Sequence, residues 1–161
     1  CFILEGDQVN EKEYTLARLI LRLANTIVKN RNVYLGTLDL TASQADSLRF
    51  FLSNPGASIT ELKEFLGITH QTARGLVFRM EAKGLVQVQR SDRDARIQRV
   101  FPTAAGEELG DTLHRNGIRT GSRLLRGMTE EEQQQFYLLA QTALRNVEHY
   151  GVEEEEKGSN Q

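Results

Sequence analysis

The fold is decided by residues 60–84, which read TELKEFLGITHQTARGLVFRMEAKG. Leu62 and Leu66 are one helical turn apart, and Gly67, which follows them, can adopt the positive φ of a tight turn. Ala73 is small enough to lie where a second helix crosses the first. This spacing predicts a helix-turn-helix. Unrelated helical hairpins can show the same spacing, so a purely structural hairpin is the alternative.

Threonines and glycines predict where these two helices begin and end. Thr60 is expected to cap a first helix over residues 61–66. Thr69 is expected to cap a second helix that runs to Lys83 and stops at Gly84. Large apolar side chains recur in the second helix and are expected to face the core, namely Leu76, Val77 and Met80.

The outward side of the second helix carries side chains that can bind DNA. Glutamine can pair with adenine, and arginine with N7 and O6 of guanine. An α-helix fits into the major groove, where the residues near its N-terminus contact the base edges. His70 in this position is expected to contact a base or a phosphate and not a metal. The predicted DNA contacts of this helix are Thr69, His70, Gln71, Thr72, Arg74 and Arg79.

A β-hairpin is predicted directly after the helix-turn-helix. Residues 85–90 alternate apolar and polar side chains, and residues 96–101 are rich in β-formers, so the two can pair across a charged turn. Arg93 and Arg96 near the turn can reach a minor groove. Asp94 can orient the Arg96 guanidinium through a charge-assisted hydrogen bond. A solvated charged turn is the alternative, and the preceding helix-turn-helix favours the wing.

A long helix and a second helix are predicted before this unit. Residues 11–33 carry apolar side chains at helical spacing, and Gly36 follows them. Thr41 and Gln44 form a capping-box pattern at the start of the next helix, which the Asn-Pro-Gly sequence at 54–56 ends.

Two more helices are predicted after the hairpin. Thr103 is expected to cap a long helix that runs to about Arg126. Its interior glycines at 110, 117 and 121 each cost about 1 kcal/mol relative to alanine, so this helix needs tertiary support or bends. Thr129 and Glu132 form a second capping-box pattern at the start of the last helix.

The predicted fold is mainly α with a small β-hairpin wing, a winged helix-turn-helix plus a helical dimerisation domain. The apolar stripes of the first and last helices exceed what the small middle region can cover, so these helices are expected to pack on a second subunit and give a homodimer. An intramolecular bundle is the alternative. The predicted parts are an N-terminal helix of the dimerisation region (1–36), a winged helix-turn-helix (37–102), C-terminal dimerisation helices (103–150) and an acidic disordered tail (151–161).

Composition excludes several classes of protein. The 161 residues have a net charge of −2 and are 39% hydrophobic, which is ordinary for a folded domain. No apolar run approaches the roughly 18 residues of a membrane span, and the N-terminus lacks the pattern of a signal peptide. Cys1 is the single cysteine and cannot form an intramolecular disulfide. A cytoplasmic location without membrane contact is expected. Because the first residue is not Met, further residues are expected upstream of it.

Neither an enzyme nor a metal or cofactor site is expected. The sequence has no Ser/His/Asp constellation and no glycine-rich phosphate loop, and its three histidines are scattered. Residues 68–99 contain seven basic and three acidic side chains, a local charge of +4 in an acidic chain. This charge suggests a polyanionic partner, and the expected one is double-stranded DNA. The alternative is a winged-helix module that binds an acidic protein.

At five places the sequence resembles the MarR family of winged-helix transcription regulators. The resemblance runs in unbroken order from about Leu16 to Val147, and Pro102 departs from it where the family usually has leucine. The stretches that carry it are LTASQADSL at 40–48, LGIT at 66–69, MEAKGLV at 80–86, SDRDAR at 91–96 and TAAG at 103–106.

The resemblance implies a bacterial or archaeal dimer whose terminal helices form the dimer domain. Such proteins usually repress promoters with inverted repeats, and many release DNA when a small aromatic or phenolic ligand binds between the two domains. By position, Arg96 would be the minor-groove arginine and Asp94 its partner. A ligand pocket is expected near Arg31, Tyr34 and Phe51, an anion partner and two aromatic walls. The two aromatic residues could equally belong to the core.

Overall fold

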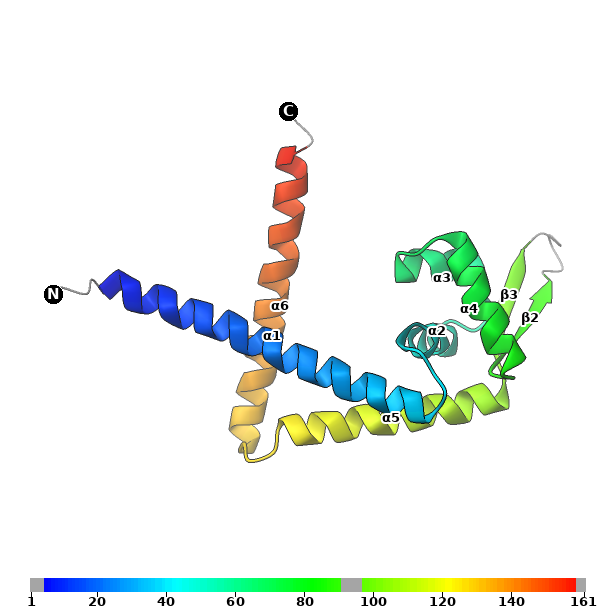
Figure 1. Cartoon of the computed structure of the whole chain (residues 1–161), viewed down its shortest axis with the longest axis horizontal. Helices are drawn as coiled ribbons and strands as arrows, with labels where there is room; N and C mark the ends of the chain where they lie inside the picture. The colour runs from blue at the N-terminus through cyan, green and yellow to red at the C-terminus, as the bar shows by residue number, and fades with distance from the viewer. Residues whose placement is uncertain (1–4, 91–96, 159–161) are drawn as a thin grey trace. The chain divides into compact units, whose positions relative to one another are not determined.

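The computed structural model describes residues 5–90 and 97–158, with side chains for 11–90 and 97–148. It is mostly helical with a small antiparallel sheet (Figure 1), so the predicted fold class is confirmed. The elements in chain order are α1 (Glu5–Thr37), α2 (Ala42–Ser53), β1 (Ala57–Ser58), α3 (Ile59–Leu66), α4 (His70–Ala82), β2 (Val86–Arg90), β3 (Gln98–Pro102), α5 (Ala104–Leu124) and α6 (Glu130–Gly158).

The chain forms two compact units, Cys1–Gly117 and Ile118–Gln161. The first contains α1, the winged helix and most of α5. The second contains the end of α5 and all of α6. The predicted winged helix at 37–102 therefore shares one unit with the helix before it. The grouping of α1 with the C-terminal helices as one dimerisation region stays a prediction.

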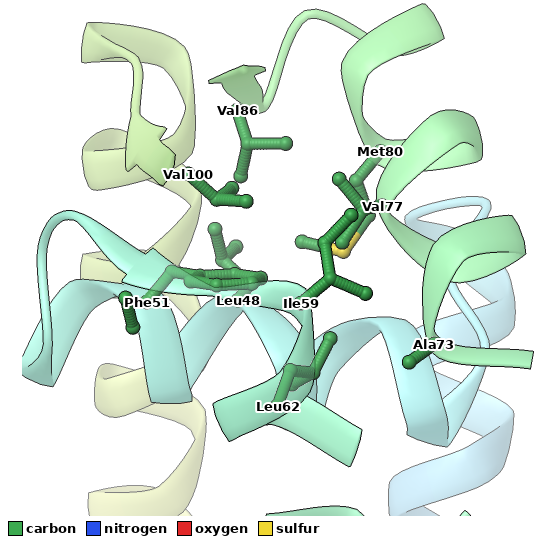
Figure 2. Packing of buried hydrophobic residues seen from close by; sticks show 10 residues of the cluster. Leu48, Phe51, Ile59, Leu62, Ala73, Val77, Met80, Val86 and Val100 are labelled. Atoms are coloured by element: carbon green, nitrogen blue, oxygen red, sulfur yellow. The ribbon is translucent and has the colours of Figure 1, made fainter. Parts of the chain in front are cut away.

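The core of the first unit lies between α2, α3, α4 and the sheet. Figure 2 shows apolar side chains from all four converging, with Leu48 and Phe51 of α2 beneath Val86 and Val100 of the two hairpin strands. Met80 of α4 has no exposed surface. Burying such side chains stabilises a fold by about 1.5–3 kcal/mol each, so this cluster holds α4 in place. The other members of the cluster are Ala57, Ile59, Leu62, Ala73 and Val77.

The three strands form an antiparallel sheet in the order β1-β3-β2. Val88 of β2 pairs with Val100 of β3, and Val100 pairs with Ala57 of β1. The predicted hairpin is confirmed. Pro102 is the last residue of β3, opposite Val86, where a missing backbone N–H disturbs the ladder least.

The caps of α2 and α3 show one correct prediction and one error. Thr41 and Gln44 form the predicted capping box of α2. The cap of α3, in contrast, is Ser58 and not Thr60, because Glu61 accepts hydrogen bonds from the Ser58 backbone N–H and hydroxyl, both at 2.7 Å. The backbone hydrogen bond from Ser58, followed by the bond from its hydroxyl, lowers the pKa of the Glu61 carboxyl.

Helix α1 is longer than predicted, beginning at Glu5 and continuing through Gly36 to Thr37. Its C-terminal end is anchored because Leu35 is buried in a second apolar cluster with Leu40, Ala45 and Leu85. This packing outweighs the cost of a glycine in the last turn, which is about 1 kcal/mol.

Two glycines of α5 allow close packing. The hydroxyl of Thr103, the predicted cap, accepts a hydrogen bond from the backbone N–H of Gly106 at 3.1 Å. A Cβ on Gly106 would overlap the carbonyl oxygen of Leu85, and a Cβ on Gly110 would overlap the side chain of Leu52. The tertiary support expected for this helix is therefore present in its first half.

Helix α6 starts as predicted but ends later. Thr129 and Glu132 form the expected reciprocal capping bonds, at 2.8 and 3.3 Å. The helix then continues to Gly158, where a disordered tail had been predicted from residue 151. Glutamate is a good helix former, so the acidic run can extend a helix that is already nucleated.

Large apolar side chains remain exposed on the two terminal helices. Over the described residues, none of the helices is both long and apolar enough to cross a membrane. The exposed side chains of α1 are Tyr14, Leu16, Leu19, Ile20, Leu21, Val28 and Val33, and those of α6 are Tyr137, Leu138, Leu139, Leu144 and Val147.

Candidate nucleic-acid interface

Helix α4 has one buried apolar face and one exposed face that is mostly polar. Its buried side chains come from Ala73, Leu76, Val77 and Met80, so the three residues predicted to face the core do so. The six predicted DNA contacts of this segment are all exposed, namely Thr69, His70, Gln71, Thr72, Arg74 and Arg79. The structure thus brings these side chains together at one surface, and their role in binding stays a prediction.

The first turn of α4 is fixed by its own threonines. Thr69 is the N-cap, and its hydroxyl accepts a hydrogen bond from the backbone N–H of Thr72 at 3.2 Å. The two threonine hydroxyls also share a hydrogen bond at 2.8 Å. The turn is therefore ordered before any ligand arrives, and the N–H groups that remain free at a helix N-terminus favour an anion such as phosphate.

The turn between α3 and α4 sets the position of α4. Gly67 has a φ of 63° and is the C-cap of α3, as predicted from its place after Leu66. The backbone N–H of Ile68 donates a hydrogen bond to the carbonyl oxygen of Lys63 at 3.2 Å. Leu66 and Ile68 then pack against the core cluster, which holds both helices to one body.

Two cations on α4 are available to a polyanion. Arg74 and Arg79 are exposed, and neither forms an ion pair within the described parts of the chain. The Arg79 guanidinium extends back along the helix over Gly75, where an added Cβ would lie 3.4 Å from its Nη1. The glycine therefore lets this guanidinium lie close to the helix surface.

The wing is joined to α4 by a side chain that the sequence did not single out. A carboxylate oxygen of Glu81 accepts a hydrogen bond from the backbone N–H of Val88 in β2, at 3.1 Å. Because β2 is an edge strand, this bond satisfies a donor that the ladder leaves free. The predicted wing contacts Arg93, Asp94 and Arg96 lie outside the described residues.

A second contact missed by the sequence ties the end of α4 to the turn after α1. The Lys83 ammonium group donates a hydrogen bond to a carboxylate oxygen of Asp39 at 2.8 Å and another to the Asp39 carbonyl oxygen. Hydrogen bonding by Lys83, together with its charge, lowers the pKa of the Asp39 carboxyl. No local pattern connects two residues that lie 44 positions apart.

The predicted ligand-pocket residues have different environments. Arg31 donates a hydrogen bond to Asp46 at 2.6 Å, so a carboxylate of the chain itself already meets its guanidinium. Tyr34 is half-buried one turn further along α1. Phe51 is completely buried in the main core cluster, which is the alternative that the sequence left open for it. A ligand pocket formed by these residues stays a prediction.

The described side chains do not include a group of three His, Cys, Asp or Glu residues placed to hold a metal ion. The described residues form an exposed helix, α4, that carries amide, hydroxyl and guanidinium groups and is packed on the core. Such groups bind and orient a partner.

Comparison with known proteins shows which family the chain is similar to. The MarR family model matches residues 38–97, from the turn after α1 to the residue before β3. A Bacillus subtilis (strain 168) protein described as the uncharacterized HTH-type transcriptional regulator YybA is 27% identical over 133 residues, which cover 83% of this chain and 89% of that protein. Over residues 38–97 the chain is therefore similar to the MarR family of transcription regulators.

Solved structures of MarR-family regulators share this fold. A variant of MarR from E. coli is 25% identical, with a TM-score of 0.69 over 80% of this chain and 96% of that one. A variant of MepR from S. aureus, solved bound to an oligodeoxyribonucleotide, is 19% identical, with a TM-score of 0.65 over 82% of this chain and 97% of that one. This chain therefore has the same winged-helix fold as those structures.

Proposed function

We propose that this chain is a dimeric, sequence-specific DNA-binding regulator of the MarR family that acts as a repressor at an inverted-repeat operator. The observation that carries the proposal is the two-faced α4. Its apolar residues are buried in the core, while Gln71, Arg74 and Arg79 are exposed on a helix that the turn at Gly67 holds in place. The MepR relative solved with DNA has the same fold.

In this account α4 enters the major groove. Gln71 and Arg74, near its N-terminal end, contact base edges, since amide and guanidinium groups pair with adenine and guanine. The free N–H groups and Arg79 contact phosphates, which fixes the register of the helix on the duplex. The wing follows in the minor groove, with Arg96 as the inserted arginine and Asp94 as its partner.

Dimerisation places two such helices on one operator. The apolar side chains of α1 and α6 are mostly more than half exposed, and single exposed leucines are common but a continuous series is not. Covering both helices with a second copy removes this surface from water. A two-fold dimer then predicts an inverted repeat whose half-sites are one helical turn apart, about 34 Å centre to centre.

Release of the DNA by a small aromatic or phenolic ligand is the remaining part of the proposal. It comes from the family resemblance and from the residues expected to line a pocket. Arg31 is the member most open to test, because a ligand anion would have to compete with Asp46 for its guanidinium.

The test is selection of bound fragments from a pool of the source genome by the full chain, followed by affinity measurements across a salt series. The account predicts enrichment of an inverted repeat and a logarithmic salt slope of about −0.9 for each phosphate neutralised. An affinity that depends only weakly on salt concentration and does not differ between DNA sequences would contradict the account. It would favour a winged-helix module that binds proteins.

A further inference from the structure

Phe78 is an aromatic side chain of α4 that the core does not use. It is 71% exposed, which makes it the most exposed large apolar residue in the described part of residues 38–102. It belongs to neither apolar cluster. Phe65 on α3 is 50% exposed but stacks on Phe50, with ring centroids 4.8 Å apart. The ring stacking explains the position of Phe65, whereas no packing within the core explains the exposed ring of Phe78.

The position of Phe78 on the helix aligns it with a predicted base contact. Successive helical residues are rotated by about 100°, so Phe78 lies within about 20° of Gln71 around the helix axis. By the same geometry it lies about 160° from Met80, which is completely buried. Gly75 lies between Gln71 and Phe78 on this face and adds no side chain. The centre of the outward face thus runs from Gln71 through Gly75 to Phe78.

Charge around Phe78 favours a nucleic-acid partner over an apolar protein groove. Arg74 lies one turn before it and Arg79 directly after it, and both are exposed. An aromatic ring between two guanidinium groups fits a surface that combines phosphates with an apolar group. The major groove is such a surface, because thymine presents its C5-methyl group there and aromatic side chains can contact it.

We propose that Phe78 contacts the C5-methyl group of a thymine in each half-site and so sets a base preference that the polar residues of α4 do not. This inference rests on the proposed DNA-binding function and adds a residue to it. Gln71 and Phe78 are seven residues apart, which is about 10 Å along the helix. For a helix that lies along the groove, this corresponds to about three base-pair steps.

The test is substitution of deoxyuridine for thymidine, one position at a time, in the operator that the wild-type chain selects. Deoxyuridine lacks only the methyl group, and loss of one apolar contact of this size predicts about fourfold weaker binding of the wild-type chain at one thymine per half-site. Phe78→Ala should bind the thymidine and deoxyuridine operators equally at that position. Alanine suits an exposed helical site, so the fold is expected to survive the change.

Phe65→Ala is the matched control, since it removes an exposed phenylalanine from the neighbouring helix and should keep the fourfold sensitivity. If Phe78→Ala keeps that sensitivity as well, or if no thymine methyl matters to the wild-type chain, the assignment of Phe78 is overturned while DNA binding stands. If the wild-type chain selects no operator, the proposed function and this inference both fail.

Discussion

The ammonium group of Lys83 donates a hydrogen bond to the carboxylate of Asp39 at 2.8 Å and so joins the C-terminal end of α4 to the turn after α1. Asp39 has a φ of 54°, a left-handed conformation that aspartate and asparagine tolerate better than most residues. The contact therefore holds the candidate recognition helix against the last turn of a helix whose other end is expected at the dimer interface.

This ion pair predicts a pH-dependent contribution to stability. Because the pKa of Asp39 is lower in the folded chain, its stabilisation is present above the unfolded pKa, about 4, and is lost as the pH falls through the folded value. Asp39→Asn should have a lower Tm than the wild type at pH 7, and the difference should shrink in a thermal-melt series towards pH 3. A difference that stays constant with pH would contradict the prediction. Asp111→Asn on α5 serves as the control.

Gly106→Ala is predicted to destabilise the first unit. The new Cβ would overlap the backbone carbonyl of Leu85, which cannot rotate away, and overpacking of this kind costs about 1–3 kcal/mol. Urea unfolding followed by circular dichroism measures this loss. Gly117→Ala in the same helix is the matched control. Its Cβ would meet nothing within 4 Å, so it should stabilise α5 by up to about 1 kcal/mol. Equal effects of the two substitutions would show that the packing at Gly106 is unimportant.

Gly75→Ala is predicted to separate stability from binding. Alanine should stabilise α4 by about 0.5–1 kcal/mol. Its Cβ would lie 3.4 Å from the Arg79 guanidinium. The added methyl group would also keep the outward face of α4 further from the DNA. Affinity for the selected operator should fall by about fivefold or more, near the lower end of the loss of one base contact. A thermal melt and a fluorescence-anisotropy titration of the same preparation measure both effects. A more stable variant with unchanged affinity would argue against close approach at Gly75.

Leu144→Lys is predicted to weaken the homodimer. Leu144 is 59% exposed on α6, so lysine should be tolerated in the single chain. In a dimer interface an unpaired charge costs about 3–5 kcal/mol, which would raise the dimer dissociation constant by at least about 100-fold. Analytical ultracentrifugation measures the change. Gln134→Lys places the same charge at an exposed position of α6 and should leave the measured mass of the dimer unchanged. A dimer that survives Leu144→Lys would place the interface elsewhere.

Local signals explain why much of the winged helix could be predicted. The capping box of Thr41 and Gln44, the turn at Gly67 and the cap at Thr69 each depend on residues within three positions of one another. The cap of α3 was predicted wrongly although a signal existed. Ser58 has Glu61 three residues later, and its carboxylate accepts the bond from the cap's N–H. Thr60 has Lys63 at the same spacing, and an ammonium group cannot accept a hydrogen bond.

The remaining features depend on tertiary structure. The hydrogen bond between Lys83 and Asp39 and the close packing of Gly106 on Leu85 join residues far apart in the chain, and no spacing rule connects them. Helical periodicity places Phe78 on the outward face of α4, but its exposure of 71% becomes known only when the neighbouring elements are placed.

The measurement that tests the central claim most directly is the affinity of the wild type and of Arg74→Ala for every single-base variant of the selected operator. Arg49→Ala, which removes an exposed arginine from α2, is the control. If α4 reads base edges, Arg74→Ala should lose about 1–3 kcal/mol and its preference at one base pair of each half-site, while other positions keep theirs. A uniform loss at all positions would instead make Arg74 a phosphate contact, and no loss at all would contradict the recognition role of α4.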